Sequence, residues 1–246
     1  MAHKQLNGGD LTQQIERLLR ELHFHPDFED ERQQHLDELA AEFGKTHKGG
    51  AREVFTLRDQ GDPEANRIWQ VGYELSLSRD YYPARVRFLE ELVPSIRGSP
   101  NTRPRVAEDG CGAGVDLYCL RHILGDQVEL IGVEPNRFAQ GLCGERNPGI
   151  ELMENLEGGQ PSDIVYCDFV SWGRNNMGVS DILDKRGEWH RALNSGGLLI
   201  QNVDFPDWQR GIYEDLVSRT FNLERDELIQ DVADNHNCHL IMFKKK

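Results

Sequence analysis

Apolar and polar positions alternate in blocks along the C-terminal part of the chain. Short apolar runs predict strands, and stretches with apolar positions three or four residues apart predict helices between them. We expect strands at residues 105–108, 128–134, 150–154, 163–168 and 198–203, and helices at residues 115–124, 137–143, 180–193 and 208–220. Residues 227–232 and 239–243 predict a closing antiparallel pair. The whole pattern predicts an α/β fold with a doubly wound, mostly parallel sheet of seven strands.

The first 48 residues carry two apolar stripes at helical spacing. The first stripe consists of Leu11, Ile15, Leu18, Leu19 and Leu22, and the second of Leu36, Leu39, Ala40 and Phe43. We therefore expect an accessory helical hairpin over residues 1–48. Each stripe needs an apolar partner, and the pattern leaves open whether that partner is the other helix, the main domain or a second subunit in a homodimer.

Residues 49–98 are expected to form a linker and a helical lid. Gly49-Gly50 and the segment 60–63 punctuate the linker, which contains a short apolar segment at residues 54–57. Two helices follow, divided near residues 78–80, and they are rich in aromatic side chains. Such aromatic density indicates either packing against the sheet or a lid over a ligand site. Residues 99–246 then form the main domain.

Composition limits the partners and the compartment. The chain has 246 residues and a formal charge of −14 at pH 7, which disfavours general binding to nucleic acid or to anionic lipid. We expect no membrane span and no secretory signal, because no apolar run approaches the ~18 residues that a bilayer requires. The five cysteines lack paired spacing, which is typical of free thiols in a cytoplasmic protein. His and Cys residues show no structural-metal spacing, so we predict no metal.

The stretch from Val106 to Val115 is the most informative motif. It places Glu108 near the end of a short strand, and glycines follow at alternate positions 110, 112 and 114 before a helix. Glycine permits a left-handed backbone and keeps side chains away from a ligand, and the helix presents its N-terminal N–H groups. A dinucleotide-binding turn has a different spacing, and a carboxylate at the pocket favours a cation over a diphosphate.

A second acid follows at the expected distance. Glu134 ends the next predicted strand, 20 residues after Gly114, where a carboxylate accepts hydrogen bonds from ribose hydroxyls. With these two acids and the glycine run, residues 100–246 resemble the class I methyltransferases, which use S-adenosyl-L-methionine. The resemblance implies a Rossmann-like sheet ending in a reversed strand, and Asn194-Ser-Gly-Gly197 matches the turn that precedes the family's fifth strand.

The resemblance also implies a set of cofactor-binding residues. Asn155 and Leu156, after the third strand, stand where the family reads the adenine edge, and Asp168 stands where it approaches the methionyl amine. An aromatic lid residue such as Tyr73 would stabilise a sulfonium cation. The expected cofactor-binding residues are Glu108, Gly110, Cys111, Gly112, Gly114, Glu134, Pro135, Asn155, Leu156, Asp168 and Tyr73.

Methyl transfer needs alignment of the acceptor and, for a protonated acceptor, a base. Asp168 and Asp204 end two neighbouring strands and are the candidate catalytic carboxylates, and Tyr82 is a candidate from the lid. The segment from Asp168 to Trp172 lacks the prolines of the branch that methylates bases and glutamine amides. We therefore expect a methyltransferase that acts on a small molecule. The alternatives are a protein or RNA methyltransferase and a non-catalytic scaffold that keeps the nucleoside pocket.

Overall fold

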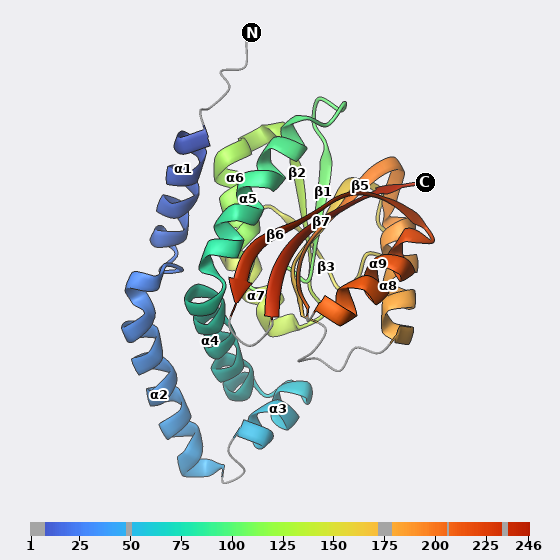
Figure 1. The fold of residues 1–246 in the computed structure, drawn as a ribbon. Helices are drawn as coiled ribbons and strands as arrows, with labels where there is room; N and C mark the ends of the chain where they lie inside the picture. The colour runs from blue at the N-terminus through green and yellow to red at the C-terminus, as the bar shows by residue number, and fades with distance from the viewer. Residues whose placement is uncertain (1–7, 48–50, 172–178, 206, 233–235) are drawn as a thin grey trace.

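The computed structural model describes residues 8–47, 51–171, 179–205, 207–232 and 236–246. Within them the chain forms one seven-stranded sheet in the order β3-β2-β1-β4-β5-β7-β6 (Figure 1). The strands are β1 (Arg105–Asp109), β2 (Glu129–Val133), β3 (Glu151–Met153), β4 (Ser162–Ser171), β5 (Leu193–Phe205), β6 (Phe221–Val232) and β7 (His236–Lys245). Strands β1 to β5 pair in parallel, and β7 runs antiparallel to both β5 and β6. The predicted fold class is confirmed.

Helices cover both faces of the sheet (Figure 1). One face is covered by α5 (Tyr82–Arg97), α6 (Val115–Leu124) and α7 (Arg137–Arg146), and the other by α8 (Val179–Ala192) and α9 (Asp207–Ser218). Side chains of a strand point alternately to its two faces. Accordingly, Val106 of β1 packs in the cluster under α5 and α6, whereas Ala107 packs in the cluster under α8 and α9. A parallel sheet buried on both faces explains why its strands read as continuous apolar runs.

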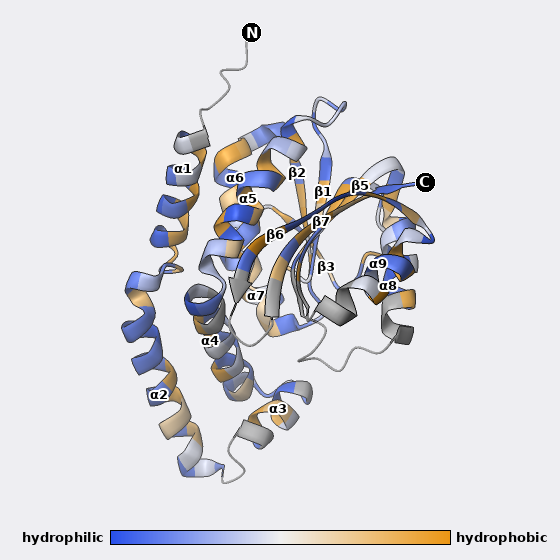
Figure 2. Ribbon diagram, in the orientation of Figure 1, coloured by the Kyte–Doolittle hydropathy of each residue, from blue (hydrophilic) through white to orange (hydrophobic). Residues whose placement is uncertain are grey.

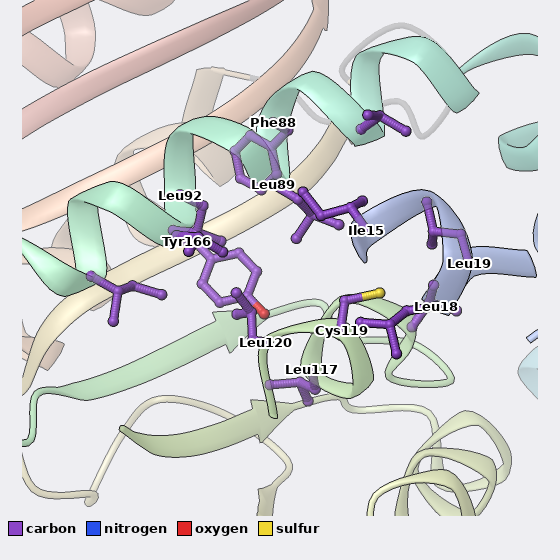
Figure 3. Packing of buried hydrophobic residues seen from close by; sticks show 14 of the residues in the cluster. Ile15, Leu18, Leu19, Phe88, Leu89, Leu92, Leu117, Cys119, Leu120 and Tyr166 are labelled. Atoms are coloured by element: carbon purple, nitrogen blue, oxygen red, sulfur yellow. The ribbon is translucent and has the colours of Figure 1, made fainter. Parts of the chain in front are cut away.

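The cluster between α5, α6 and the sheet also holds the first N-terminal helix, α1 (Gly8–Glu21). Figure 3 shows Ile15, Leu18 and Leu19 of α1 facing side chains of α5 and α6. All three are at most 1 % exposed, so the α1 stripe is covered within the chain. Burial of one such side chain contributes about 1.5 to 3 kcal/mol. The main domain is therefore the partner of the first stripe.

The second N-terminal helix has a different partner. Helix α2 (Glu29–Thr46) packs against α4 (Pro63–Asp80) through a small cluster of Phe43, Ala65 and Ile68. The segment expected to be an apolar stretch of linker is α3 (Ala51–Asp59), a helix whose Val54 and Leu57 pack on this same cluster. The linker interpretation of that segment was wrong, because a short apolar run does not distinguish a helix from other buried structure. Figure 2 shows the outer side of α2 as mostly hydrophilic.

One predicted turn lies inside a strand. Residues 194–197 belong to β5, because Leu193 already pairs with Ser162 of β4. The register then shifts, and Leu198 pairs with Ile164, so the residues between them bulge out of the ladder. Gly196 has a φ of +71°, which permits this local departure.

In the part of the chain that the structure describes, no helix is both long enough and apolar enough to cross a bilayer.

Candidate active site

The glycine loop lies between β1 and α6, at the carboxyl ends of the parallel strands. The N–H groups of Gly110 and Cys111 both donate to the carbonyl of Val133, at 2.8 and 3.0 Å, and so attach the loop to the end of β2. Gly110 and Gly112 have φ values of +82° and +50°, and a Cβ built on either meets no atom within 4 Å. The loop therefore presents bare backbone to open space, which is the form that a closely approaching ligand requires.

Gly114 differs from the other two glycines. A Cβ there would lie 2.4 Å from the Sγ of Cys143 and 2.5 Å from the Nδ2 of Asn147, both on the side of α7. Asn147 also donates to the carbonyl of Gly114 at 2.8 Å. This glycine is needed for close packing between the loop and α7, and not for access of a ligand.

The two acids of the motif are held by different partners. Glu108 is buried, and its Oε2 accepts a hydrogen bond from the hydroxyl of Tyr166 at 2.8 Å. Burial, together with the nearby Asp116, raises the pKa of Glu108 well above its usual value. Glu134 accepts from the backbone N–H groups of Gly112 and Asn136, at 2.9 and 2.8 Å, and burial raises its pKa as well. Its carboxyl group thus connects the glycine loop to the loop after β2.

A buried ionic cluster lies opposite the glycine loop. Arg85 of α5 contacts Asp168 of β4, with Nη2 and Oδ2 2.8 Å apart, and Asp116 of α6, with Nη1 and Oδ1 3.6 Å apart. Asn202 of β5 donates to the other oxygen of Asp168 at 2.8 Å. The Arg85 guanidinium also lies 4.7 Å from the ring centre of Phe24. Four segments of the chain therefore meet at this one cation.

The carboxyl groups of this cluster outnumber its cations. Burial opposes the charge of Arg85, but Asp116 and Asp168 more than offset it, and the pKa of Arg85 is raised. Burial raises the pKa of Asp116, with Arg85 acting against the shift and the charge of Asp168 adding to it. With Glu108 beside them, three buried carboxyl groups surround one guanidinium. A further cation is the ligand that such a cluster favours.

These groups line one cavity of about 30 Å³, roughly the space of one water molecule. Helix α4 contributes Gln70, Tyr73 and Glu74 to the wall of this cavity. Glu74 is itself neutralised by Arg32 of α2 at 3.1 Å and Arg146 of α7 at 3.7 Å. A cavity of this volume is too small for a nucleoside, so binding of one requires the lining residues, among them those of α4, to move.

The structure brings together several of the residues that the sequence predicted, and separates others. Glu108, Gly110, Cys111, Gly112, Asp168 and Tyr73 line the cavity, and Glu134 lies beside it through its bond to Gly112. Tyr73 stacks on Trp69 with 5.0 Å between ring centres. Tyr82 does not line this cavity; it is packed in the apolar cluster that holds α1, with its ring 4.9 Å from that of His25, and burial raises its pKa to about 12.

The other predicted residues whose side chains the structure describes do not line the cavity. Pro135 and Asn155 are exposed, and the side chain of Asn155 accepts from the N–H of Glu157 at 3.0 Å. The N–H of Leu156, expected to read adenine, donates to Glu188 of α8 at 3.0 Å. Asp204 lies in β5 opposite Cys238 of β7, and its side chain is outside the described residues.

Among the cavity-lining residues that sequence reasoning missed are the charged Arg85 and Asp116 and the aromatic Phe24. A signal for Arg85 was available, because it occupies an apolar position of its helix, four residues before Leu89 and seven before Leu92. Phe24 reaches the cavity through a tight turn after α1, where His23 has a φ of +55°. That placement depends on tertiary structure and has no counterpart in the local pattern.

The residues present fit a cationic sulfur nucleoside. The glycine backbone is open, and three buried carboxyl groups share a single guanidinium. Asp116 Oδ1 and Asp168 Oδ2 face Arg85 as ion-pair partners and, among the described residues, accept no further hydrogen bond. Buried oxygens of this kind are where a ligand with N–H donors gains the most. The fit combines charge, donor set and backbone access.

Comparison with known proteins supports the same class of fold. Solved methyltransferases are similar in structure, at low sequence identity. The N-methyltransferase NodS from Bradyrhizobium japonicum WM9, in complex with S-adenosyl-l-homocysteine, matches with a TM-score of 0.54 and 15% identity, over 69% of this chain and 90% of that chain. Magnesium protoporphyrin IX methyltransferase from Synechocystis PCC 6803, with bound SAM, matches with a TM-score of 0.53 and 12% identity, over 69% of this chain and 84% of that chain.

A third structure, the cyclopropane synthase MmaA2 from Mycobacterium tuberculosis, matches with a TM-score of 0.52 and 10% identity, over 66% of this chain and 84% of that chain. No protein-family model matches the sequence. A search of curated protein sequences also finds no match. The chain therefore has the fold of the class I methyltransferases that use S-adenosyl-L-methionine.

Proposed function

We propose that this protein is a methyltransferase that binds S-adenosyl-L-methionine beside the glycine loop and methylates a small molecule. The observation that supports this most is the meeting of the open glycine backbone with three buried carboxyl groups and one guanidinium. The fold supports it as well, since similar structures were solved with S-adenosyl-l-homocysteine or SAM. When bound, the cofactor supplies a methyl group activated on a sulfonium.

Residues of this chain can hold each part of that cofactor. Glu134 is placed to accept hydrogen bonds from ribose hydroxyls, after releasing the N–H of Gly112. Asp168 and Asp116 would attract the cationic end, and Arg85 would pair with the cofactor carboxylate. Tyr73 offers an aromatic face to the sulfonium. Under this proposal the Arg85 cluster exchanges internal ion pairs for ion pairs with the ligand.

The N–H of Leu156, which we expect to bind the adenine edge, must first lose its present hydrogen bond. The N–H of Leu156 is bonded to Glu188, which in turn pairs with Lys185 at 3.0 Å. We propose that adenine replaces Glu188 at this N–H and that Glu188 remains paired with Lys185. Cofactor binding then breaks several contacts within the protein. The site opens only for a ligand that forms equivalent contacts in their place.

The acceptor in this proposal is small, because the cavity at the carboxylate cluster has a volume of only about 30 Å³. The similar structures include an N-methyltransferase, a porphyrin methyltransferase and a cyclopropane synthase. Asp168 is the candidate base, and Asp204 and Tyr82 stay as predictions. The homodimer also stays a prediction, without support from α1, whose apolar face is covered within the chain. Cytoplasmic location likewise remains an expectation.

Calorimetry tests the binding step. We expect S-adenosyl-L-methionine to bind, and we expect no binding of NADH. Glu134→Ala should weaken cofactor binding by about 1 to 3 kcal/mol through loss of the ribose hydrogen bonds. Glu154→Ala is the matched control, because this exposed acid follows the neighbouring strand β3 and pairs with Arg137 on the surface. NADH binding in place of the cofactor would overturn the proposal.

Transfer of labelled methyl groups tests the acceptor class. Extracts separated into metabolite, protein and RNA fractions should give label in the metabolite fraction only. Label in the protein or RNA fraction would assign the enzyme to a macromolecular acceptor. Cofactor binding without label in any fraction would favour a non-catalytic scaffold.

A further inference from the structure

Two buried thiols meet beneath the glycine loop. The Sγ of Cys111, in the loop, lies 3.9 Å from the Sγ of Cys143 on α7. All five cysteines lie within the described residues, where they are buried and form no disulfide. Nothing in the proposed methyl transfer uses this pair, although one of its members lines the proposed cofactor cavity.

Two neighbouring glycines leave the space in which the two sulfurs lie close together. A Cβ on Gly132 of β2 would lie 2.9 Å from the Sγ of Cys111, and a Cβ on Gly114 would lie 2.4 Å from the Sγ of Cys143. Both distances are shorter than real carbon contacts, so no other residue fits at either position without a shift. The absence of side chains on both sides lets the two sulfurs occupy one shared space.

The loop has the freedom to bring the sulfurs together. An S–S bond is ~2.05 Å long, so the 3.9 Å separation must shrink by about 1.9 Å. Cys143 is fixed within α7, but Cys111 stands between Gly110 and Gly112, which both adopt positive φ. Glycine absorbs changes of φ and ψ at little cost. Cys111 is therefore the partner that moves.

The two thiols differ in chemical character. Cys111 donates its S–H to Cys143, which lowers the pKa of Cys143 and raises that of Cys111. Asn147 also donates to the Sγ of Cys143, at 3.8 Å. The thiolate is the nucleophilic form of cysteine. Cys143, whose pKa is lowered, is 0 % exposed, and a small oxidant reaches the pair through the cavity that Cys111 lines.

We propose that Cys111 and Cys143 form a reversible disulfide in the presence of a peroxide, and that this disulfide weakens cofactor binding. The second half of the proposal rests on the proposed function. The thiolate of the pair attacks hydrogen peroxide, the O–O bond breaks, and a sulfenic acid forms as hydroxide takes up a proton to become water. The other thiol then attacks the sulfenic sulfur, the S–O bond breaks, an S–S bond forms, and a second water leaves.

The effect on the site follows from the position of Cys111. Movement of Cys111 toward α7 shifts its neighbours Gly110 and Gly112, whose backbone faces the cavity. The bond between the N–H of Gly112 and Glu134 is strained by the same shift. Both the open backbone and the ribose-binding acid are then displaced, and we expect cofactor affinity to fall about tenfold or more.

Peroxide treatment of the full chain tests the modification. Peptide mass spectrometry should find residues 111 and 143 cross-linked with loss of two hydrogen atoms, while Cys119 and Cys167 stay as free thiols. Those two are buried as deeply, with 0 % and 2 % exposure, and serve as internal controls. Cys143→Ser and Cys143→Ala should form no such cross-link; the serine variant preserves an acceptor for Asn147, so at least one of the two should fold.

Calorimetry with S-adenosyl-l-homocysteine on the same samples tests the coupling. The loss of affinity should grow with the cross-linked fraction and should disappear after a thiol reductant is added. If Cys119 is oxidised while residues 111 and 143 stay reduced, the pair has no special reactivity and the proposal fails. Full cross-linking with unaltered affinity would refute the coupling. A reduced protein that binds no S-adenosyl-l-homocysteine would instead contradict the proposed function, and the cross-link would still be judged by its mass.

Discussion

One face of α5 carries both the apolar core and the ionic cluster of the candidate site. Leu89, Leu92 and Ile96 occupy successive positions on this face and are at most 3 % exposed. Arg85 continues the same stripe toward the N-terminal end of the helix and is equally buried, at 5 %. Within three helical turns the environment changes from purely apolar to a guanidinium among carboxyl groups. The apolar residues of this row stabilise the core. The one charged residue in the row lies at the candidate site.

Removal of the charge at that position should have the largest effect on stability. Arg85→Leu leaves Asp116 and Asp168 buried without their cation, and loss of one member of a buried pair costs about 3 to 5 kcal/mol. Urea denaturation measures the change. Arg87→Leu is the control, since Arg87 lies on the same helix with a 42 % exposed side chain and surface ion pairs worth about 0 to 1 kcal/mol. If the Arg85 variant is as stable as the parent, the proposed difference between the ionic end and the apolar end of α5 is wrong.

The apolar end of the helix should respond through cavity formation. Leu92→Ala removes a fully buried side chain, at 0 % exposure, and should lower the free energy of unfolding by about 2 to 5 kcal/mol. Cofactor affinity should not change, because Leu92 does not line the cavity. The exposed Arg97→Ala, at the end of the same helix, should stay within about 0.5 kcal/mol of the parent. A large loss of cofactor affinity in Leu92→Ala would show that core and site are not separable.

The glycine loop allows the same contrast at two neighbouring positions. Gly114→Ala should destabilise by about 2 to 4 kcal/mol, because overpacking against α7 adds to the strain of a left-handed residue. Gly112→Ala should cost only about 1 kcal/mol, since its Cβ meets no atom within 4 Å. Cofactor binding should show the reverse order, with Gly112→Ala the more damaging. Chemical denaturation measures the effect of each variant on stability, and calorimetry measures its effect on cofactor binding. Equal effects of the two variants would contradict separate roles in packing for Gly114 and in ligand access for Gly112.

The last contrast concerns pH. Burial raises the pKa of Glu108, so the folded protein retains a proton that the unfolded chain loses above the ordinary carboxyl range. Folding stability therefore falls as pH rises from that range toward the raised pKa, by at most about 1.4 kcal/mol per pH unit for one group. Glu108→Gln removes this contribution, and its stability relative to the parent should increase between about pH 5 and pH 8. A constant difference over that window would mean that Glu108 is already ionised in the folded protein.

The sequence predicted what depends on local patterns. The strand ends, the glycine loop and the two acids Glu108 and Glu134 are encoded within about 30 residues, because apolar runs and glycine spacing report directly on backbone geometry. The limits of individual elements were less accurate, as the bulge at residues 194–197 shows. The segment at 54–57, which forms part of α3, was too short for its periodicity to identify a helix.

The ionic cluster could not be predicted in the same way. Arg85, Asp116 and Asp168 come from α5, α6 and β4, and their contact depends on how the N-terminal helices dock on the sheet. The pairing of Leu156 with Glu188 is also a contact between distant segments. Such pairings leave no periodic signal. The one local sign was a charge in an apolar stripe, and interpreting it requires knowledge of what faces that stripe.

A crystal structure of the protein with S-adenosyl-l-homocysteine tests the proposed site most directly. We expect the nucleoside beside Gly110 and Gly112, with its ribose hydroxyls bonded to Glu134, its carboxylate paired with Arg85, and α4 displaced from the cavity. Density for the nucleoside at another place, with Arg85 still paired to Asp168, would contradict the assignment of this cavity as the cofactor site.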